Sequence, residues 1–168
     1  MLRRMGSREP LIARSQADVM RQKREYLIGS KEAHRIMVEY GVDPEEKKGM
    51  GGETVVEWWI DISVTGGGVV LAEKTDFSKP SSFVAPEGGY QPTIRFTENT
   101  GMRNGRYHRT LKPELFVLFP DGTYARLETR FTHDIKRPFA VVRSWFNPSG
   151  SRNTEFDPSL EIEVAAEQ

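Results

Sequence analysis

The stretch LFVLFPDGTYARLETRF, residues 115–131, decides the fold that the sequence predicts. Two runs rich in apolar, aromatic and β-branched residues, 115–119 and 123–131, flank the tripeptide Pro-Asp-Gly at 120–122. An Asp-Gly pair supplies the positive backbone angles that a tight turn between antiparallel strands requires. We therefore expect a β-hairpin at this position and an antiparallel sheet around it.

The segments on either side of this hairpin also have strand patterns. In residues 53–64, apolar side chains at every second position alternate with polar ones, so one face of a strand is expected to be buried. The turn Thr-Gly-Gly-Gly at 65–68 predicts a hairpin with a following strand at 69–72. The sequence further predicts a long loop at 76–92. Three more strands are predicted at 93–97, 139–146 and 160–164.

Residues 15–41 are expected to form one long amphipathic helix. Val19, Tyr26 and Tyr40 recur at multiples of seven residues, and further apolar side chains share the same side of a helix. The stripe favours contact with a core or with a neighbouring protein. We assign this protein contact to Val19, Met20, Tyr26, Leu27, Ile36 and Met37.

The predicted fold is mainly β (α+β), an antiparallel sheet or small sandwich preceded by that helix. Four regions follow along the chain: a basic extension at 1–14, the helix at 15–41, a polar linker at 42–52, and a β domain at 53–168. In the β domain, Phe139, Val141 and Trp145 share one face of a strand, which we expect to be the core face.

Charge is segregated along the chain, although Lys plus Arg and Asp plus Glu both number 24. Residues 1–40 carry a net charge of +4, 41–100 of −5, 101–153 of +6 and 154–168 of −5. Such blocks indicate contact with charged partners, or a surface on which the charges mix. The absence of Cys excludes disulfides, Cys-ligated zinc and a Cys nucleophile, and no apolar run is long enough to cross a membrane.

The first 24 residues contain seven Lys or Arg and only two acids, and Met1–Met5 is rich in Arg. This composition is typical of a mitochondrial targeting segment, and it lacks the apolar stretch of a secretory signal. We expect a mitochondrial matrix location with this segment retained.

No catalytic or cofactor signature emerges from the sequence, so we expect neither an enzyme, nor a cofactor, nor a metal site. His34 is expected on a solvated face among charges, and no histidine pair has the spacing of a zinc site. His133 beside Asp134 could be an oriented base, but no nucleophile motif accompanies it.

The basic block after residue 100 instead indicates binding to nucleic acid. Lys and Arg neutralise phosphates, and interleaved aromatic side chains stack on unpaired bases. The candidate RNA-binding residues are Arg103, Arg106, Tyr107, His108, Arg109, Lys112, Arg130, Lys136, Arg137 and Arg143.

Residues 111–150 carry a family resemblance. The hairpin turn at 120–123, the strand Thr-Arg-Phe-Thr at 129–132 and the run Trp-Phe-Asn-Pro-Ser-Gly at 145–150 are similar to segments of the bacterial-type large-subunit ribosomal protein family numbered thirty-one, which has mitochondrial members. The His of both His-Pro pairs of that family and its zinc-binding cysteines are absent here. The resemblance implies a non-catalytic subunit of the mitochondrial ribosome, which contacts ribosomal RNA and neighbouring proteins.

Two other classes of function stay open. One is a protein-only structural subunit, such as an accessory subunit of a respiratory complex or ATP synthase, or a viral capsid or decoration protein. The other is a small enzyme or ligand-binding β protein, which would have a pocket lined by Trp58, Trp59 or Trp145. No small-molecule substrate is expected on the leading hypothesis.

Overall fold

The computed structural model describes residues 2–5, 21–43, 47–49, 51–72, 83–103, 106–107, 109–134 and 138–155. For the strand residues 2–5, 102–103 and 106–107, only the backbone pairing is described.

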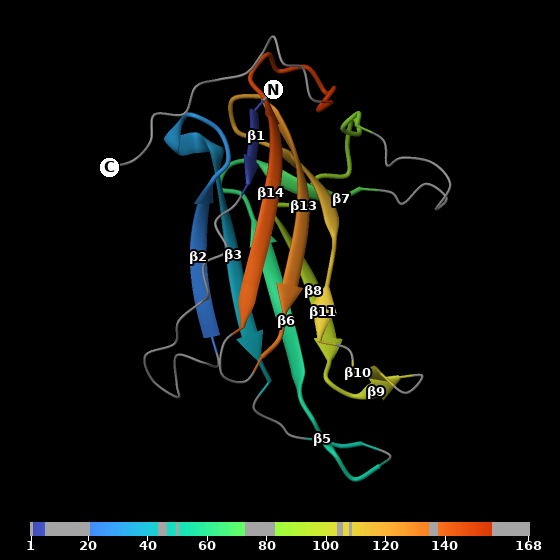
Figure 1. The fold of residues 1–168 in the computed structure, drawn as a ribbon. Coiled ribbons are helices and arrows are strands. Elements are labelled where there is room, and N and C mark those ends of the chain that lie inside the picture. Colours follow the sequence, from blue (N-terminus) through green and yellow to red (C-terminus); the bar gives the residue numbers. More distant parts are fainter. Residues whose placement is uncertain are drawn as a thin grey trace.

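Two antiparallel sheets form the body of the molecule (Figure 1). Sheet A has the strand order β1-β14-β13-β12-β7, and β11 also pairs with β13. Its strands are β1 Leu2–Met5, β7 Gly68–Leu71, β11 Thr110–Leu111, β12 Glu114–Leu118, β13 Tyr124–Thr132 and β14 Phe139–Asn147. Sheet B has the order β2-β3-β6-β8, with strands β2 Arg21–Leu27, β3 Arg35–Val42, β6 Glu57–Ser63 and β8 Thr93–Asn99.

Two short hairpins and one turn of helix complete the described part of the chain. The hairpins are β4 Lys47–Lys48 with β5 Thr54–Val55, and β9 Met102–Arg103 with β10 Arg106–Tyr107. The helical turn is the 3-10 segment η1, Glu32–His34.

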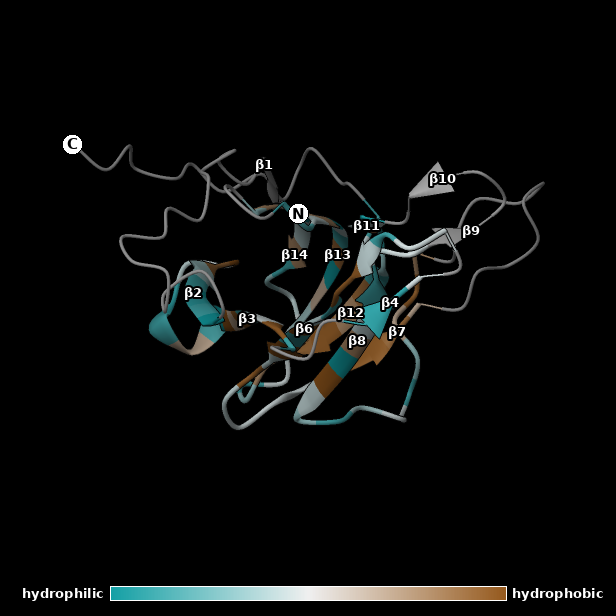
Figure 2. Ribbon diagram, turned by 90° about the horizontal axis from the view of Figure 1, so that it is seen from below, coloured by the Kyte–Doolittle hydropathy of each residue, from teal (hydrophilic) through white to brown (hydrophobic). Residues whose placement is uncertain are grey.

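The two sheets pack face to face on one apolar core. Seen along the strands, the two sheets form two layers (Figure 2), and one cluster of buried hydrophobic residues contains members of both. The core contains Trp58, Ile60 and Ile62 from β6 together with Leu115 and Leu127 from sheet A, all at most 2% exposed. Because side chains alternate between the faces of a strand, every second residue of each central strand enters this core. The expected antiparallel β fold is therefore confirmed.

The predicted strands lie close to the observed ones. The hairpin at 115–131 appears as β12 and β13, joined at Gly122, which has the positive φ of 79° that the turn requires. In β6, Trp58, Ile60 and Ile62 are buried, and the side chains between them face outward, as the alternation predicts. The predicted strand at 160–164 lies outside the described residues.

The long helix expected over residues 15–41 is wrong where the structure describes that region, because β2 and β3 occupy most of residues 21–42. Ile36, Val38 and Tyr40 occupy every second position of β3 and pack on sheet A. The apolar residues of this segment thus follow the two-residue repeat of a strand and not the seven-residue repeat of a helix. Gly29 makes the turn between the strands possible, because a Cβ at Gly29 would overlap the His34 ring. Residues 15–20 lie outside the described part.

Two further expectations about pairing need correction. The strand that follows the turn at 65–68 does not pair with β6, because β7 crosses to sheet A and pairs with β12. Within the predicted linker at 42–52, Lys47–Lys48 form β4 and pair with Thr54–Val55.

The face that Phe139, Val141 and Trp145 share is also not the core face. Ala140, Val142, Ser144 and Phe146 of β14 are buried toward sheet B. The three residues between them are therefore on the outer face of sheet A, where each is only partly exposed.

Candidate functional site

The candidate site is a set of three exposed cations on the outer face of sheet A, which we call the basic face: Lys112, Arg130 and Arg143. Lys112 follows β11, whose register places Leu111 opposite Phe131. The amide of Thr129 donates to the Pro113 carbonyl at 3.1 Å, so Lys112 lies beside Arg130. Arg130 is opposite Val141, and Arg143 is opposite Glu128. Arg130 and Arg143 are thus diagonal neighbours on adjacent strands.

Aromatic and apolar side chains accompany these cations. Residues directly opposite each other in an antiparallel pair face the same side of the sheet, so Val141 shares the outer face with Arg130. The Arg130 guanidinium lies 5.8 Å from the centre of the Phe139 ring. Cations interleaved with aromatic rings can contact both the phosphates and the bases of a single-stranded nucleic acid.

Arg126 lies four residues before Arg130 on the same face of β13, and it is buried although it is charged, with its side chain 6% exposed. Its guanidinium lies 4.8 Å from the centre of the Phe83 ring and 5.2 Å from that of Trp145. One terminal nitrogen donates to Glu114 at 2.9 Å and to Glu128 at 3.3 Å. A buried charge requires such paired carboxylates, so Arg126 has a structural role rather than being available to a ligand.

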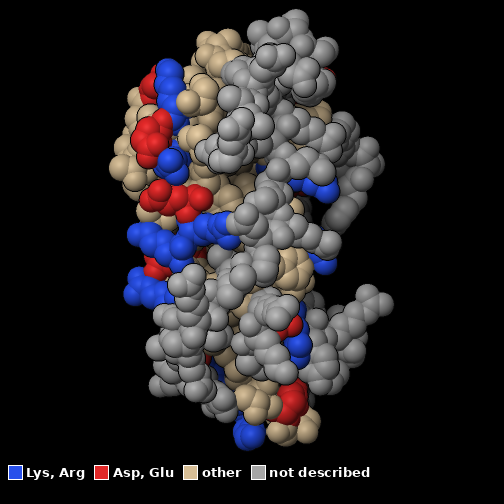
Figure 3. Space-filling model, turned by 60° about the vertical axis from the view of Figure 1, so that its left-hand side comes forward, with Lys and Arg blue, Asp and Glu red and all other residues tan. Residues whose placement is uncertain are grey.

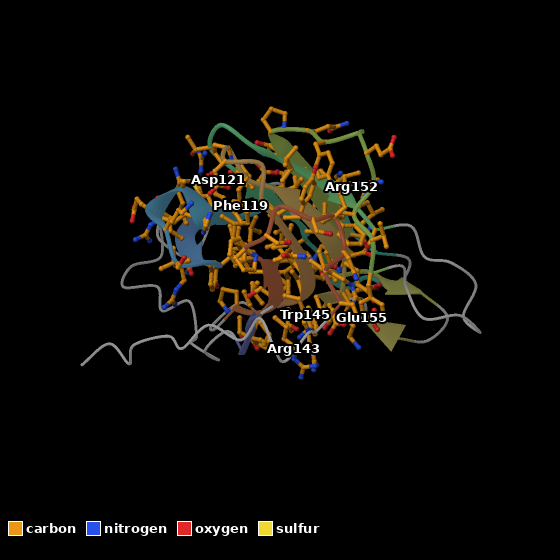
Figure 4. The ribbon with its side chains drawn as sticks, turned by 90° about the horizontal axis from the view of Figure 1, so that it is seen from above. Phe119, Asp121, Arg143, Trp145, Arg152 and Glu155 are labelled. Carbon is orange, nitrogen blue, oxygen red and sulfur yellow. The ribbon has the colours of Figure 1, made fainter. Side chains whose placement is uncertain are left out.

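Phe83 belongs to a cover over this end of sheet A, formed by residues 83–91 and 151–155. The two segments hold each other, because the Ala85 amide donates to the Arg152 carbonyl and the Thr154 amide to the Phe83 carbonyl, both at 2.8 Å. Ala85 packs with Phe116 on the sheet beneath. In the view along the strands, Glu155, Trp145 and Arg143 lie on the same side of the molecule (Figure 4).

The other predicted RNA-binding residues are not gathered on this face by any described contact. Arg103, Arg106 and Tyr107 lie in the β9–β10 hairpin, where only the backbone is described. Arg109 is exposed near His133, whose amide donates to the Arg109 carbonyl at 2.8 Å. Three residues lie outside the described part: His108, Lys136 and Arg137.

The residues predicted to contact a neighbouring protein have different positions. Ile36 is 1% exposed in the core, so its contact is within this chain and not with a partner. Tyr26 packs against the same core, and burial raises the pKa of its phenol against the opposing effect of the Arg24 charge. Leu27 and Met37 are partly exposed on β2 and β3, and Val19 and Met20 lie outside the described part.

His34 is buried, at 1% exposure, and not on a solvated face as the sequence suggested. Its Nδ1 accepts the Lys31 amide proton at 3.3 Å, which assigns the ring proton to Nε2. Nε2 therefore donates to Asp121 Oδ2 at 2.9 Å, and Lys31 Nζ donates to the same oxygen at 3.0 Å. The Thr123 hydroxyl donates to Asp121 Oδ1 at 2.6 Å.

This His34–Asp121 cluster joins the β2–β3 connection of sheet B to the β12–β13 turn of sheet A. The hydrogen bond from Thr123, followed by those from His34 and Lys31, holds the pKa of Asp121 well below its usual range. A general base needs an unoccupied ring nitrogen near the proton that it removes. Both nitrogens of His34 already have partners, so the cluster is a tether between the sheets.

His133 occupies the opposite end of the core with Tyr40 and Trp58. The Tyr40 hydroxyl and His133 Nδ1 are 2.7 Å apart, and the indole of Trp58 stacks on the His133 ring with the ring centres 5.7 Å apart. Burial, and then the Arg109 charge, lower the pKa of His133, while burial raises the pKa of Tyr40. Both groups are therefore neutral at pH 7. Together they form a polar contact between the sheets.

The outer face of sheet B has charges of both signs that pair with each other. Arg95 donates two hydrogen bonds to Asp61, at 2.7 and 2.6 Å, and Arg21 pairs with Glu39. Figure 3, which brings the β2 side of the molecule forward, shows blue and red side chains side by side. Among the described residues of this face, basic and acidic side chains therefore largely neutralise each other.

The three tryptophans do not line a common pocket. Trp58 is in the core. Trp59 lies over Gly41 on the outer face of sheet B, with the Arg95 guanidinium 4.2 Å from its ring centre, and Trp145 is on the outer face of sheet A. The three tryptophans therefore lie in three different environments, and the described contacts do not bring them together at one site.

Within the described ranges, no three His, Asp or Glu side chains form a group that could hold a metal ion. Among the same residues there is no helix of sufficient length and apolar character to cross a membrane.

The structural roles of Arg126, His34 and Asp121 were not predicted from the sequence. The alternation in β13 places Arg126 on the outer face, and no local pattern shows that Phe83 covers it. Asp121 was identified only as a turn residue, because its partner His34 is 87 positions away in the sequence.

Comparison of the chain with protein-family models, curated proteins and solved structures gave no match. The function is therefore inferred from the geometry of the residues described above.

Proposed function

We propose that this protein is a non-catalytic subunit of a ribonucleoprotein assembly and that its basic face binds the RNA backbone. The main observation is that Lys112 lies beside Arg130, that Arg143 is diagonal to Arg130 on the other side, and that all three are exposed on the outer face of sheet A. Like charges opposite each other on a sheet repel, and an anionic partner removes that repulsion. Phosphates of an RNA strand supply such charges in a row.

The side chains that could take part in catalysis are bonded within the protein, and this supports a non-catalytic role. His34 and His133 are buried and bonded within the sandwich, and Arg126 is paired with two glutamates. In the described part of the chain, these contacts hold the two sheets and the cover together. The protein acts by presenting a surface.

The mitochondrial ribosome is the assembly that the sequence resemblance implies, with ribosomal RNA and neighbouring proteins as partners. The basic residues before position 15 would direct the chain to the mitochondrial matrix. Purification of the tagged protein from its own cells, with and without ribonuclease, tests this assignment. Recovery of large-subunit RNA would support it, and a set of proteins unaffected by ribonuclease would favour the protein-only alternative.

The direct test measures binding of a fluorescent poly(U) RNA of about 20 nucleotides to the full chain at several salt concentrations. In the variant Lys112→Glu with Arg130→Glu, we expect the affinity to fall at least tenfold and the salt slope to decrease by about 1–2. The matched control is Lys23→Glu with Lys48→Glu, which changes the net charge equally at two exposed lysines elsewhere. Equal losses in the two variants would contradict a specific basic face.

A further inference from the structure

An aromatic ring, that of Phe139, lies next to the cations of the basic face. Phe139 is opposite Thr132, and Val141, the next outward-facing residue of β14, is opposite Arg130. Phe139 is therefore a diagonal neighbour of Arg130, and diagonal side chains of adjacent antiparallel strands are close enough for an aromatic ring to touch a long side chain. The Arg130 guanidinium lies 5.8 Å from the centre of the Phe139 ring, so the two groups are in contact.

The charges beside this ring are not neutralised by acids in the described part of the chain. Arg126, on the same face of the same strand, pairs with two glutamates. Among the described residues, neither Arg130 nor Lys112 forms an ion pair. Both side chains are exposed, so their charges are available to an anionic partner.

Phe139 also differs from the other aromatic side chain of this face. Trp145 is in contact with Arg126, which is itself covered by the Phe83 ring. Phe139 is partly exposed, and in the described part of the chain the Arg130 guanidinium is the one aromatic or cationic group on its ring. The basic face therefore offers a partly open ring and unneutralised cations side by side.

Such a combination distinguishes between the forms of RNA. Unpaired bases stack on aromatic rings and on Arg guanidinium planes while basic side chains hold the phosphates. In a duplex the bases are stacked on each other, so a duplex presents its phosphates to the cations but no base to the ring. A face with cations alone would have no reason to prefer an unpaired strand.

We propose that the basic face binds single-stranded RNA, with an unpaired base stacked on the Phe139 ring and neighbouring phosphates on Arg130 and Lys112. The inference rests on the proposed function, because it names the form of RNA that this face binds. Every base has a π face, so the ring contact accepts any base. Phosphate contacts and stacking are separate contributions, and each can be removed without the other.

The first test compares the affinity of the full chain for three RNAs of equal length: the fluorescent poly(U) strand, an abasic strand and a duplex. The abasic strand has the phosphates of poly(U) but no bases. We expect poly(U) to bind about tenfold more tightly than the abasic strand, which is the gain typical of a stacked base. Equal affinities for these two strands would overturn the stacking and leave the backbone contact standing.

The second test removes the ring and keeps the charges. We expect Phe139→Leu to weaken poly(U) binding about fivefold and to leave binding of the abasic strand and the duplex unchanged. Phe139→Tyr keeps a ring and should bind poly(U) like the wild type. The matched control is Phe96→Leu, the same substitution at a partly buried ring of sheet B, which should change none of the affinities. Equal losses for poly(U) and the abasic strand in Phe139→Leu would overturn the proposal.

The NMR signals of the Phe139 ring protons give a direct readout. We expect poly(U) to shift them and the abasic strand to shift them much less. Unshifted ring signals at saturating poly(U) would overturn the stacking, although the RNA would still be bound. If the full chain binds none of the three RNAs at low salt, the proposed function itself is wrong, and the stacking fails with it.

Discussion

Among single residues, Asp121 has several side-chain hydrogen bonds that shift its pKa. It accepts hydrogen bonds from Thr123, His34 and Lys31, which favour its ionised form. Its pKa is therefore lower in the folded than in the unfolded chain. The unfolded state binds more protons in acid, so the stabilisation is full above the ordinary carboxyl range near pH 4 and is lost as the pH falls below it.

We expect Asp121→Asn to lower the free energy of unfolding by about 1–3 kcal/mol at pH 7, because charged hydrogen bonds are lost. The deficit should shrink toward pH 3, where the wild-type carboxylate also begins to lose its advantage. Urea unfolding at both pH values measures this difference. Glu87→Gln, at an exposed ion pair with Arg152, is the control. An equal deficit at pH 7 and pH 3 would contradict the role of ionised Asp121.

For single residues, the sequence correctly predicts which side chains are buried and where the turn lies, but not which distant residues they contact. The alternation of Trp58, Ile60 and Ile62 with polar residues correctly predicts which side chains are buried. The Asp-Gly pair correctly predicts the turn at 121–122. Neither pattern carries information about His34, because that contact depends on how two sheets meet across a long sequence separation.

At the scale of elements, the cover depends on Phe83. Its ring on the buried Arg126 guanidinium is a desolvated cation–π contact, of about 2 kcal/mol. We expect Phe83→Ala to speed hydrogen exchange of the Ala85 and Thr154 amides roughly tenfold, while the Leu127 amide in the core is unaffected.

The control for this prediction is the neighbouring Val84→Ala, because Val84 is 49% exposed. Exchange that accelerates equally in both variants would mean that Phe83 does not hold the cover. Acceleration at Leu127 as well would indicate a general loss of stability.

The elements that the sequence predicted best are those with clear alternation bounded by turns, such as β12 and β13. Strand β2 was missed because its sequence, RQKREYL, is rich in long polar residues that also favour helices. These side chains suit an edge strand, where charges discourage pairing with other molecules. Pairing with β3 over its full length, and not local preference, makes this segment a strand.

For the whole molecule, the shared core makes the two sheets interdependent. Ile36, Val38 and Tyr40 of β3 pack in the same cluster as Leu115 and Leu127 of sheet A. A fragment of residues 53–168, the β domain expected from sequence, would lack β2 and β3. We expect it to have no cooperative unfolding transition, whereas the full chain unfolds in one transition by tryptophan fluorescence and circular dichroism.

A chain that begins at residue 21 is the matched control, because it retains all of sheet B and every residue of the described core. This control should unfold cooperatively. A cooperative transition in the 53–168 fragment would show that β2 and β3 are dispensable to the fold.

Two strands of the sandwich pair with segments that follow them in the chain, and this order has a consequence for biosynthesis. Strand β7 pairs with β12, and β6 with β8, so each needs a neighbour that is translated later. At about 5–20 residues per second, β7 emerges roughly 2–9 s before β12 is complete. During that interval the nascent chain exposes open strand edges to which other nascent chains on the same polysome can pair. Slower translation between residues 72 and 118 would lengthen that exposure, so codon choice in this interval bears directly on the yield of native protein.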